Sequence, residues 1–334
     1  MLKIISTQQS KSWQEILSEL VTDPSELVSL LELDVSLKPL SLLANDQFPL
    51  KVPMPFVQKI AKGDWNDPLL RQIWPSRDEE EVDLTYVSDP LAEAKSNPVS
   101  GLLHKYHGRV LLTAAPHCAI HCRYCFRRHF DYEDNAPSRK AWQDCFDYIT
   151  SDASIEEVIL SGGDPLALAD KQFGWLLEQI ELIPHVNTVR IHSRLPLVIP
   201  QRITTELLQL LSNRRVNLVL VIHCNHAAEL CRDSMEGLRT LAANGVTMLN
   251  QSVVLADVND NVQDLSKLSR KLFSAGVLPY YLHLPDEVAG TKHFDVKTAK
   301  AKELIRAMQT RLPGYLVPKL VKEEAGKPAK TRIA

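Results

Sequence analysis

Residues 117–129 read His-Cys-Ala-Ile-His-Cys-Arg-Tyr-Cys-Phe-Arg-Arg-His and hold three cysteines, Cys118, Cys122 and Cys125, in the spacing C-x3-C-x2-C. Thiolates this close together on one loop can converge on a single centre, and soft sulfur ligands select zinc, copper(I) or iron–sulfur clusters. A [4Fe–4S] cluster normally takes four cysteines. The other cysteines of the chain are Cys145, Cys224 and Cys231. One iron would therefore stay open to a chelating ligand, and S-adenosylmethionine is the chelator that radical chemistry uses.

A structural zinc site is the main alternative for the same loop. Zinc would take the three cysteines and one histidine, with His117, His121 or His129 as the fourth ligand. Structural zinc sites usually draw their ligands as two separated pairs, whereas this run is continuous, so the pattern favours iron and sulfur. Disulfides are disfavoured because six cysteines in 334 residues are sparse. Reduced thiols indicate a reducing compartment, and we expect a cytoplasmic protein.

Apolar runs from residue 109 onward predict six buried strands, separated by amphipathic stretches that predict helices. The expected strands are 109–115, 158–160, 188–192, 216–223, 246–255 and 277–284. The expected helices are 138–149, 170–183, 204–211, 227–243, 261–275 and 297–311. Repeated βα units with continuous apolar strands imply a parallel sheet covered by helices, either doubly wound or barrel-like.

Polar residues follow the expected strands in a way that favours the barrel. In a barrel, the functional groups lie at the C-terminal ends of the strands and in the loops after them. The cysteine loop follows the first expected strand, residues 161–165 follow the second, and His192-Ser-Arg194 ends the third. Six units rather than eight would leave such a barrel incomplete.

The first 100 residues have shorter apolar stretches and three Asp-Pro pairs, which begin at Asp23, Asp67 and Asp89. Each pair fits an N-cap followed by proline at the first helical position, so we expect a small helical region. The acidic run 78–81 predicts a solvated loop. The net charge of -3 gives no general attraction to nucleic acid or to an anionic membrane. Residues 1–6 are too short an apolar stretch for a signal sequence, and no run reaches about 18 apolar residues.

The cysteine loop resembles a known family. C-x3-C-x2-C, followed by Phe126 and the paired Arg127 and Arg128, is similar to the motif of the radical S-adenosylmethionine (radical SAM) enzymes of the lysine 2,3-aminomutase group. The resemblance implies an α/β fold, a partial (β/α)6 TIM-like radical SAM barrel with a helical N-terminal region. The expected division is a helical region at 1–100, the barrel at 101–311 and a C-terminal segment at 312–334 that carries a candidate lysine.

The same resemblance implies a site for S-adenosylmethionine after the second expected strand. The family's Gly-Gly-Asp/Glu motif lets the backbone approach a ligand, and its carboxylate accepts from the methionine ammonium group. Without the resemblance, these residues read as a tight strand-to-helix turn. The residues that match the family's positions around this cofactor are Ser161, Gly162, Gly163, Asp164, Arg194 and Gln251.

Enzymes of this group also use pyridoxal 5'-phosphate, held as a Schiff base by a lysine near the C-terminus. Composition alone describes this part of the chain as a solvated, flexible tail. The family's segment ends in Lys-Thr, which selects Lys330 over Lys327. Tyr106 and Arg109 match the residues that pack against and bind the pyridoxal phosphate.

For the substrate, the resemblance assigns Arg127 to the amino-acid carboxylate and Asp286 to the distal ammonium group. The family's second aspartate falls on Glu323, a longer acid, and this departure puts efficient turnover of free lysine in doubt. The implied enzyme is an isomerase, a lysine 2,3-aminomutase that converts L-lysine to (R)-β-lysine with a 5'-deoxyadenosyl radical.

The short chain resembles the branch that supplies β-lysine for modification of elongation factor P. The implied partners are L-lysine and a reductant such as flavodoxin or ferredoxin, and the oligomeric state, a homo-oligomer included, is left open. Two other classes of protein also stay open at this point. One is a radical SAM enzyme without pyridoxal phosphate, such as a protein activase, and the other is a zinc-stabilised binding protein.

Overall fold

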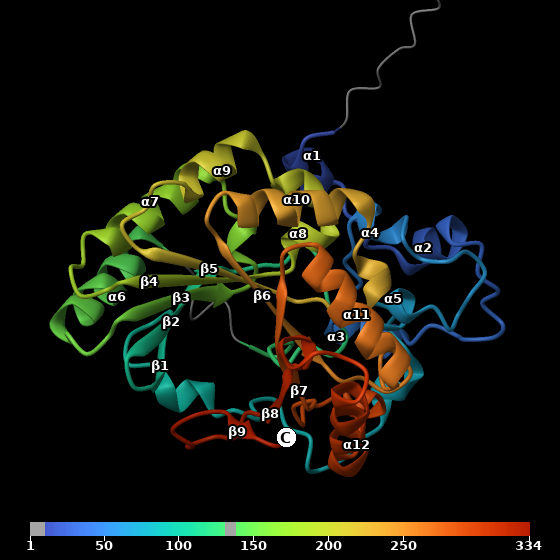
Figure 1. The fold of residues 1–334 in the computed structure, drawn as a ribbon. Helices are drawn as coiled ribbons and strands as arrows, with labels where there is room; N and C mark the ends of the chain where they lie inside the picture. Colours follow the sequence, from blue (N-terminus) through green and yellow to red (C-terminus); the bar gives the residue numbers. More distant parts are fainter. Residues whose placement is uncertain (1–10, 131–137) are drawn as a thin grey trace, which may run out of the picture.

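A curved sheet of nine strands, in the order β1 to β9, forms the centre of the molecule (Figure 1). The computed structural model describes residues 11–130 and 138–334, so the apolar stretch at residues 1–6 lies outside the described residues. The strands are β1 Leu102–Tyr106, β2 Arg109–Ala115, β3 Glu157–Gly162, β4 Thr188–Ser193, β5 Asn217–Ile222, β6 Thr247–Val253, β7 Leu278–His283, β8 Lys319–Lys322 and β9 Thr331–Arg332. Strands β2 to β8 pair in parallel, whereas β1 and β9 pair antiparallel at the two edges.

All six expected strands are confirmed, as β2 to β7. The central residues of β2, β3 and β5 are mostly apolar and buried, since a parallel sheet is covered on both faces, whereas β4, β6 and β7 alternate or are only partly buried. The sequence did not predict β8, which adds a further parallel strand by pairing Leu320 with Leu282 of β7. The strand order is linear, which makes the sheet an open barrel with β1 and β9 at its two ends.

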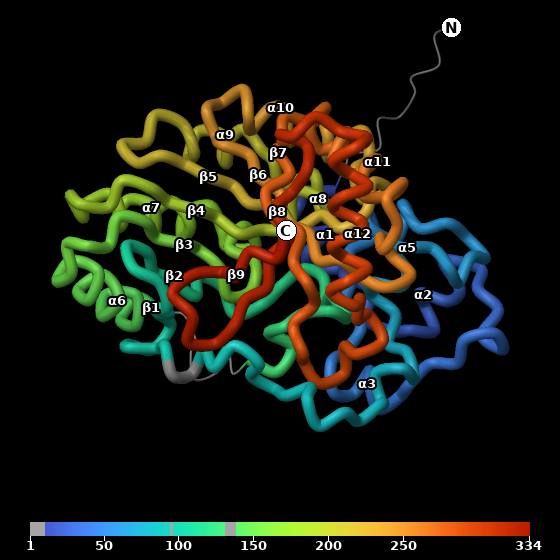
Figure 2. The backbone as a smooth tube through the Cα atoms, turned by 60° about the horizontal axis from the view of Figure 1, so that its bottom comes forward, coloured from blue at the N-terminus to red at the C-terminus, as the bar shows by residue number. Residues whose placement is uncertain are grey.

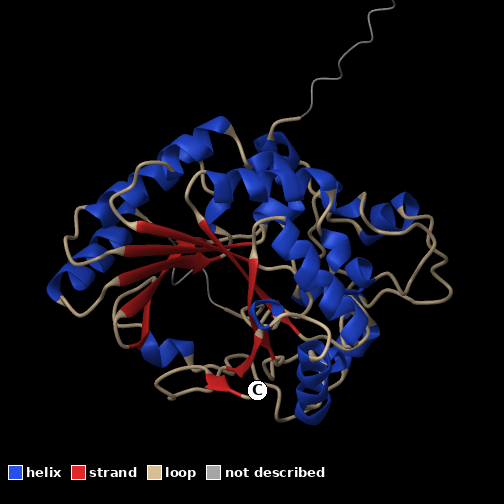
Figure 3. Cartoon of the chain, in the orientation of Figure 1, coloured by secondary structure: helices blue, strands red, loops and turns tan. Residues whose placement is uncertain are grey.

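Helices lie along the outer face of the sheet (Figure 3). They are α6 Arg139–Ser151, α7 Asp170–Glu181, α8 Leu195–Val198, α9 Thr205–Leu211, α10 Arg232–Ala243, α11 Val262–Ser274 and α12 Thr298–Gln309. The expected helices are confirmed except for the start of the one expected at 227–243. That helix begins at Arg232, because Ala227–Glu229 form a separate 3-10 turn (η5) in which Glu229 accepts from the backbone N–H of His226 at 3.0 Å.

Short helices form the N-terminal region, as expected. They are α1 Trp13–Ser18, α2 Pro24–Leu30, α3 Leu42–Gln47, α4 Met54–Val57 and α5 Pro68–Arg71, with 3-10 turns η1 Arg77–Glu80 and η2 Glu93–Ser96. Asp23 and Asp67 cap α2 and α5, which confirms two of the three Asp-Pro predictions. The third was wrong: Pro90 lies in a turn, and the Asp89 carboxylate accepts instead from the N–H of Glu93 at 3.0 Å.

The N-terminal helices and the barrel share one buried apolar cluster, to which Leu27 and Phe56 contribute from one side and Leu112 and Leu160 from the other. This shared packing fixes the N-terminal region against the strand that precedes the cysteine loop. The expected boundaries near residues 100 and 312 stay predictions. Within 11–130 and 138–334, no helix is both long enough and apolar enough to cross a membrane.

The C-terminal segment adds two strands to the sheet, so the flexible tail that composition suggested for residues 322–331 was wrong at its two ends, whereas residues 325–329 between them are exposed. Leu320 of β8 is fully buried in an apolar cluster that includes Leu282 and Ile305. The chain then passes through a loop and returns as β9, where Thr331 pairs with Lys322. Figure 2 shows this segment near β1 and β2, on the open side of the barrel.

If β8 is a structural strand, Leu320→Ala should lower the free energy of unfolding by about 2–5 kcal/mol, because it leaves a cavity in a packed core. Leu182→Ala is the matched control, since Leu182 is 73% exposed at the end of α7, and it should change stability by less than about 0.5 kcal/mol. Urea unfolding of both variants measures the difference. Equal, small effects would show that the C-terminal segment is not packed into the fold.

Candidate active site

The three cysteines lie in one irregular loop between β2 and α6, where the backbone N–H of Cys125 donates to the carbonyl of Cys122 at 2.9 Å. Burial, then Asp164 and the two other thiols, raise the pKa of Cys118 well above its usual range. Burial, then Cys122, raise the pKa of Cys125 to about 11. The three thiols therefore lie within electrostatic reach of one another, and a metal centre would bind them by displacing their protons.

Two of the three histidines of the loop have one ring nitrogen against a backbone carbonyl. Nδ1 of His121 lies 2.8 Å from the carbonyl oxygen of Pro49, and its ring stacks on Phe48 at 4.5 Å. Nε2 of His129 lies 3.2 Å from the carbonyl oxygen of Ala289. In the part of the chain that the structure describes, no three His, Cys, Asp or Glu side chains are gathered as ligands of one ion. Since a cubane cluster takes each thiolate at a separate iron, this donor set fits a [4Fe–4S] cluster better than a single zinc ion.

Two arginines of the loop anchor it to the N-terminal region through Glu79. Nε of Arg123 donates to Glu79 at 2.8 Å, and Nη2 of Arg128 donates to the same carboxylate at 2.7 Å. Arg123 also donates to the carbonyl oxygens of Phe48 and Ala44. The Glu79 side chain is 1% exposed, so the expectation of a solvated acidic loop was wrong for this residue.

Two glycines at the end of β3, Gly162 and Gly163, let the backbone of the cysteine loop lie close to this strand end. A Cβ on Gly163 would lie 2.3 Å from the carbonyl oxygen of His117, and one on Gly162, where φ is +98°, would lie 2.7 Å from Cγ2 of Thr113. The N–H of Gly163 donates to the carbonyl of Ala115 at 2.8 Å. The glycines therefore admit the backbone of the cysteine loop, and their expected approach to a bound ligand stays a prediction.

Asp164 ties this glycine turn to the end of β4. Its carboxylate accepts from the Ser193 hydroxyl at 2.7 Å and from the backbone N–H groups of Leu166, Arg194 and Leu195 at 2.8–3.0 Å. These bonds use the roughly four acceptor positions of a carboxylate. The structure thus gives Asp164 a positioning role, and its expected contact with an ammonium group stays a prediction that requires one bond to be exchanged.

Arg194 reaches the cysteine loop itself. Its Nη1 lies 2.7 Å from Sγ of Cys122, and its Nη2 donates to Glu229 at 2.8 Å and to Gln72 at 2.7 Å. The Glu229 and Gln72 side chains are fully buried, and neither was expected at the site. No pattern in the sequence marks them, because an acid in an expected helix and an amide after a short helix are ordinary surface residues by pattern.

Lys330 lies in a cluster of charges on the open side of the barrel. Its ammonium pairs with Glu323, and Nζ of Lys105 lies 3.4 Å from the same carboxylate. The Tyr106 hydroxyl also helps to lower the pKa of Glu323. Burial would raise the pKa of Glu323, but Lys330 and Lys105 outweigh it and lower this pKa to about 2. Lys330 is partly buried in this cluster, whereas Lys327 is exposed and lines the neighbouring cavity, so the choice of Lys330 over Lys327 stays a prediction.

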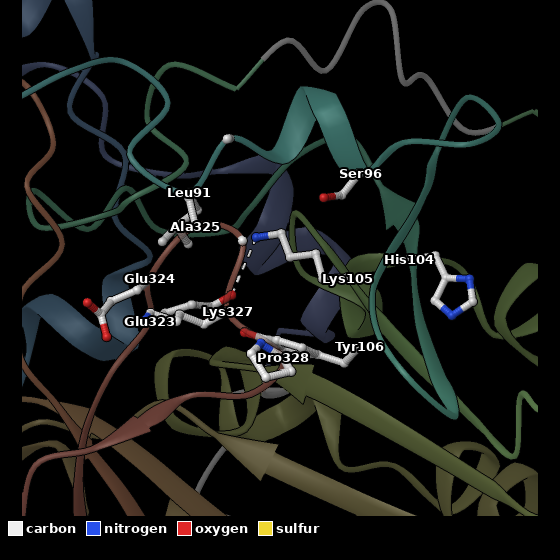
Figure 4. Close-up of a pocket in the computed structure, with 12 residues that line it drawn as sticks. Leu91, Ser96, His104, Lys105, Tyr106, Glu323, Glu324, Ala325, Lys327 and Pro328 are labelled. Atoms are coloured by element: carbon white, nitrogen blue, oxygen red, sulfur yellow. Dashed lines mark hydrogen bonds and ion pairs between the residues drawn. The ribbon is translucent and has the colours of Figure 1, made fainter.

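A cavity of about 490 Å³ opens beside this cluster (Figure 4). Lys105 and Tyr106 of β1 line one side, and Glu323 and Glu324 of the C-terminal segment line the other. The guanidinium of Arg109 lies 4.7 Å from the centre of the Tyr106 ring. Pyridoxal phosphate is an aromatic aldehyde with a phosphate, so its site needs an amine, an aromatic face and cations. Lys330 offers the amine, Tyr106 the aromatic face, and Lys105 and Arg109 the cations, so these residues fit pyridoxal phosphate.

Arg127 is held by a carboxylate that the sequence did not point to. Its Nε and Nη2 donate to Glu93 at 2.8 and 2.9 Å, and its Nη1 donates to Ser161 at 3.3 Å. Glu93 is 5% exposed and also accepts from Lys105 at 3.1 Å. Glu93 therefore orients both the arginine expected to bind substrate and the lysine that faces Glu323.

His192, His223 and His283 lie within electrostatic reach of Lys330. Burial is the chief cause that lowers the pKa of each imidazole, and the charge of Lys330 lowers it further. The pKa falls to about 4 for His223 and to about 3 for His283, so both imidazoles are neutral at pH 7. Nε2 of His223 lies 2.7 Å from Nε2 of Gln251. Among the described residues, Nε2 of His192 and of His283 is buried without a hydrogen-bond partner. Orphaned polar atoms of this kind are expected where a bound molecule supplies the partner.

Asp286 faces the same cluster from the end of β7. Burial, then the nearby Glu323, raise its pKa to about 7, and Lys330 and Lys105 limit the rise. A carboxylate in this state is stabilised by an additional cation. Asp286 and Glu323 thus lie within electrostatic reach of each other, and their expected binding of the distal ammonium group of the substrate stays a prediction.

Comparison with known families gives one domain match, to a 4Fe-4S single cluster domain, over residues 107–191. This stretch contains the cysteine loop and the glycine turn. The crystal structure of Streptococcus suis SuiB bound to S-adenosylmethionine superposes with a TM-score of 0.50 and 14% identity, covering 67% of this chain and 52% of SuiB. At this identity, the likeness shows the radical SAM fold alone.

Several characterised relatives are similar over most of the chain. L-lysine 2,3-aminomutase from Escherichia coli is 46% identical over 330 residues, which cover 98% of this chain and 96% of that enzyme. L-lysine 2,3-aminomutase from Haemophilus influenzae is 45% identical, with 98% and 97% covered. The enzyme of the same name from Clostridium subterminale is 36% identical, with 83% and 67% covered.

The close approach at Gly163 predicts that Gly163→Ala separates the glycine turn from the cysteine loop. Overpacking of this kind costs about 1–3 kcal/mol, and the variant should bind less iron per chain after anaerobic reconstitution. Gly314→Ala is the control, since a Cβ on Gly314 meets nothing within 4 Å. Wild-type stability together with wild-type iron content in Gly163→Ala would contradict this account of the loop.

Proposed function

Because the chain belongs to the L-lysine 2,3-aminomutase family, we propose that it is an isomerase that converts L-lysine to (R)-β-lysine. The observation that carries the proposal is the convergence of Lys330, Glu323 and Asp286 beside a cavity at the open side of a radical SAM barrel. When bound, the cluster with S-adenosylmethionine supplies a hydrogen-abstracting radical, and pyridoxal phosphate supplies a ring that stabilises the migrating amino group. The protein supplies position and exclusion of water.

The cysteine loop would hold the cluster, through Cys118, Cys122 and Cys125. The residues proposed to surround S-adenosylmethionine are Ser161, Gly162, Gly163, Asp164, Arg194 and Gln251. The proposal is supported by a contact between the glycine turn and the cysteine loop: the backbone N–H of Asp164 donates to the His117 carbonyl at 3.0 Å.

Lys330 would hold the pyridoxal phosphate, with Tyr106 against the ring and Arg109 near the phosphate. Lys330 must first leave Glu323, since its ammonium is engaged there. An amine reacts with an aldehyde only after losing its proton, so the ion pair with Glu323 must be broken before Lys330 can react. Support for this assignment is the partly buried position of Lys330 and its pairing with Glu323, which lines the cavity.

Arg127 would bind the lysine carboxylate, and Asp286 with Glu323 would receive the distal ammonium group. A guanidinium offers two edges to carboxylates, and Glu93 takes the edge formed by Nε and Nη2. The substrate would approach the other edge, where Ser161 now accepts at 3.3 Å.

We further propose that the product serves modification of elongation factor P, that a flavodoxin or ferredoxin supplies the electron, and that the enzyme works in the cytoplasm. The support is chemical: a cluster held by thiolates requires a reducing compartment and a one-electron donor of low potential. All six cysteines of the chain are free thiols, which agrees with that compartment.

The proposal is tested by anaerobic incubation of the full chain with L-lysine, S-adenosylmethionine, pyridoxal phosphate and dithionite. Mass spectrometry of the products should find β-lysine, formed only when all components are present. Cys125→Ala should lose both the bound iron and the product. A fully reconstituted wild-type protein that forms no β-lysine would refute the assignment.

Borohydride reduction of the enzyme with bound pyridoxal phosphate should fix the pyridoxyl mass on the peptide that contains Lys330. Lys330→Ala should lose that label and at least about 100-fold in product formation, because the cofactor is no longer positioned, while its iron content stays unchanged. The exposed Lys327 provides the control, and Lys327→Ala should keep label and activity. A label on Lys327 would move the attachment site.

The raised pKa of Asp286 predicts a pH-dependent KM for lysine. Below about pH 7 the carboxyl is protonated and cannot pair with an ammonium group, so KM should rise, by at most about tenfold per pH unit. Asp286→Asn should show a higher KM without this dependence, and the exposed Asp295→Asn should keep the wild-type profile. A wild-type KM that is flat between pH 6 and 8 would exclude Asp286 from substrate binding.

A further inference from the structure

Arg194 places a buried positive charge against a thiol that the cluster would use. It follows β4 directly, is 6% exposed, and its Nη1 lies 2.7 Å from Sγ of Cys122. The rings of Phe56 and Tyr124 lie 5.4 and 5.8 Å from the guanidinium carbon and keep water from it. In such a site, a charge acts on its neighbours far more strongly than it would in water.

Glu229 places a buried negative charge on the other side of the same guanidinium. Its Oε2 accepts from Nη2 of Arg194 at 2.8 Å, and its side chain is fully buried. Oε1 accepts from the backbone N–H groups of Asn225 at 2.9 Å and His226 at 3.0 Å. The carboxylate is thus held by hydrogen bonds at both of its oxygens, so its position does not depend on the Cys122 thiol.

The reduction potential of an iron–sulfur cluster depends on local charge and on hydrogen bonds to its sulfur atoms. We infer that Arg194 and Glu229 are an opposed pair that sets this potential: Arg194 raises it by donating to the Cys122 sulfur, and Glu229 lowers it by offsetting that charge. On reduction the cluster gains one electron from an external low-potential donor, and no bond forms or breaks. The inference rests on the cluster named in the proposed function, but not on the aminomutase activity.

Gln72 completes the environment of the pair. Its Oε1 accepts from Nη2 of Arg194 at 2.7 Å and from the Asn225 side chain at 3.2 Å. It is neutral, fully buried and of nearly the shape of a glutamate. Its Nε2 donates to the Pro68 carbonyl at 3.0 Å and to Oε1 of Glu229 at 3.4 Å, so the amide also helps to hold Glu229 in place.

The test is a dithionite titration of the anaerobically reconstituted full chain, with the reduced cluster followed by EPR. Arg194→Gln should shift the midpoint potential to more negative values, and Glu229→Gln should shift it to more positive values. The matched control is the pair Arg214 and Glu181, 3.0 Å apart and distant from the cysteine loop. Arg214→Gln and Glu181→Gln should leave the potential at the wild-type value.

Opposite shifts distinguish this role from a structural one, because loss of packing would lower iron content and stability in both variants alike. Shifts of the same sign, or none, in variants that keep wild-type iron content would overturn the inference. If Glu229→Gln does not fold, Arg194→Gln still decides the outcome, since it must move the potential downward. Failure to form β-lysine would leave this measurement unaffected, so the two proposals fail separately.

Discussion

The backbone of the cysteine loop lies against the glycine turn so closely that Gly163 has no room for a side chain, with His117 2.3 Å from the position of a Cβ. Three features depend on this contact. It holds the loop over the C-terminal ends of β2 and β3, it brings Asp164 to the end of β4, and through Asp164 it places Arg194 against a thiol. The site is therefore built by adjacent strands of one sheet, each adding one element at the same edge.

Buried carboxylates hold the arginines of the site in place. Glu79 forms ion pairs with two arginines of the cysteine loop, Glu93 pairs with Arg127, and Glu229 pairs with Arg194. Breaking a buried pair of this kind by removing one partner costs about 3–5 kcal/mol, because a charge is left without a counter-charge. The N-terminal region supplies two of these acids, so it helps to build the site as well as cover the barrel.

The strands of the barrel were predictable because their apolar runs are local and continuous. The three cysteines were equally plain, since their spacing lies within one loop. Glu79, Glu93 and Glu229 could not be found in this way, because each meets its arginine only through the fold. The order of the C-terminal segment was hidden for a similar reason: β8 is short, and its burial depends on pairing with β7.

The central claim is that three thiolates hold a cubane cluster whose fourth iron is open to S-adenosylmethionine. Mössbauer spectroscopy of ⁵⁷Fe-reconstituted protein, with and without S-adenosylmethionine, tests it most directly. The account predicts about four irons per chain, one of which changes its isomer shift when S-adenosylmethionine is added while the other three do not. Spectra that stay the same on addition, or a protein that binds one zinc ion and no iron, would contradict it.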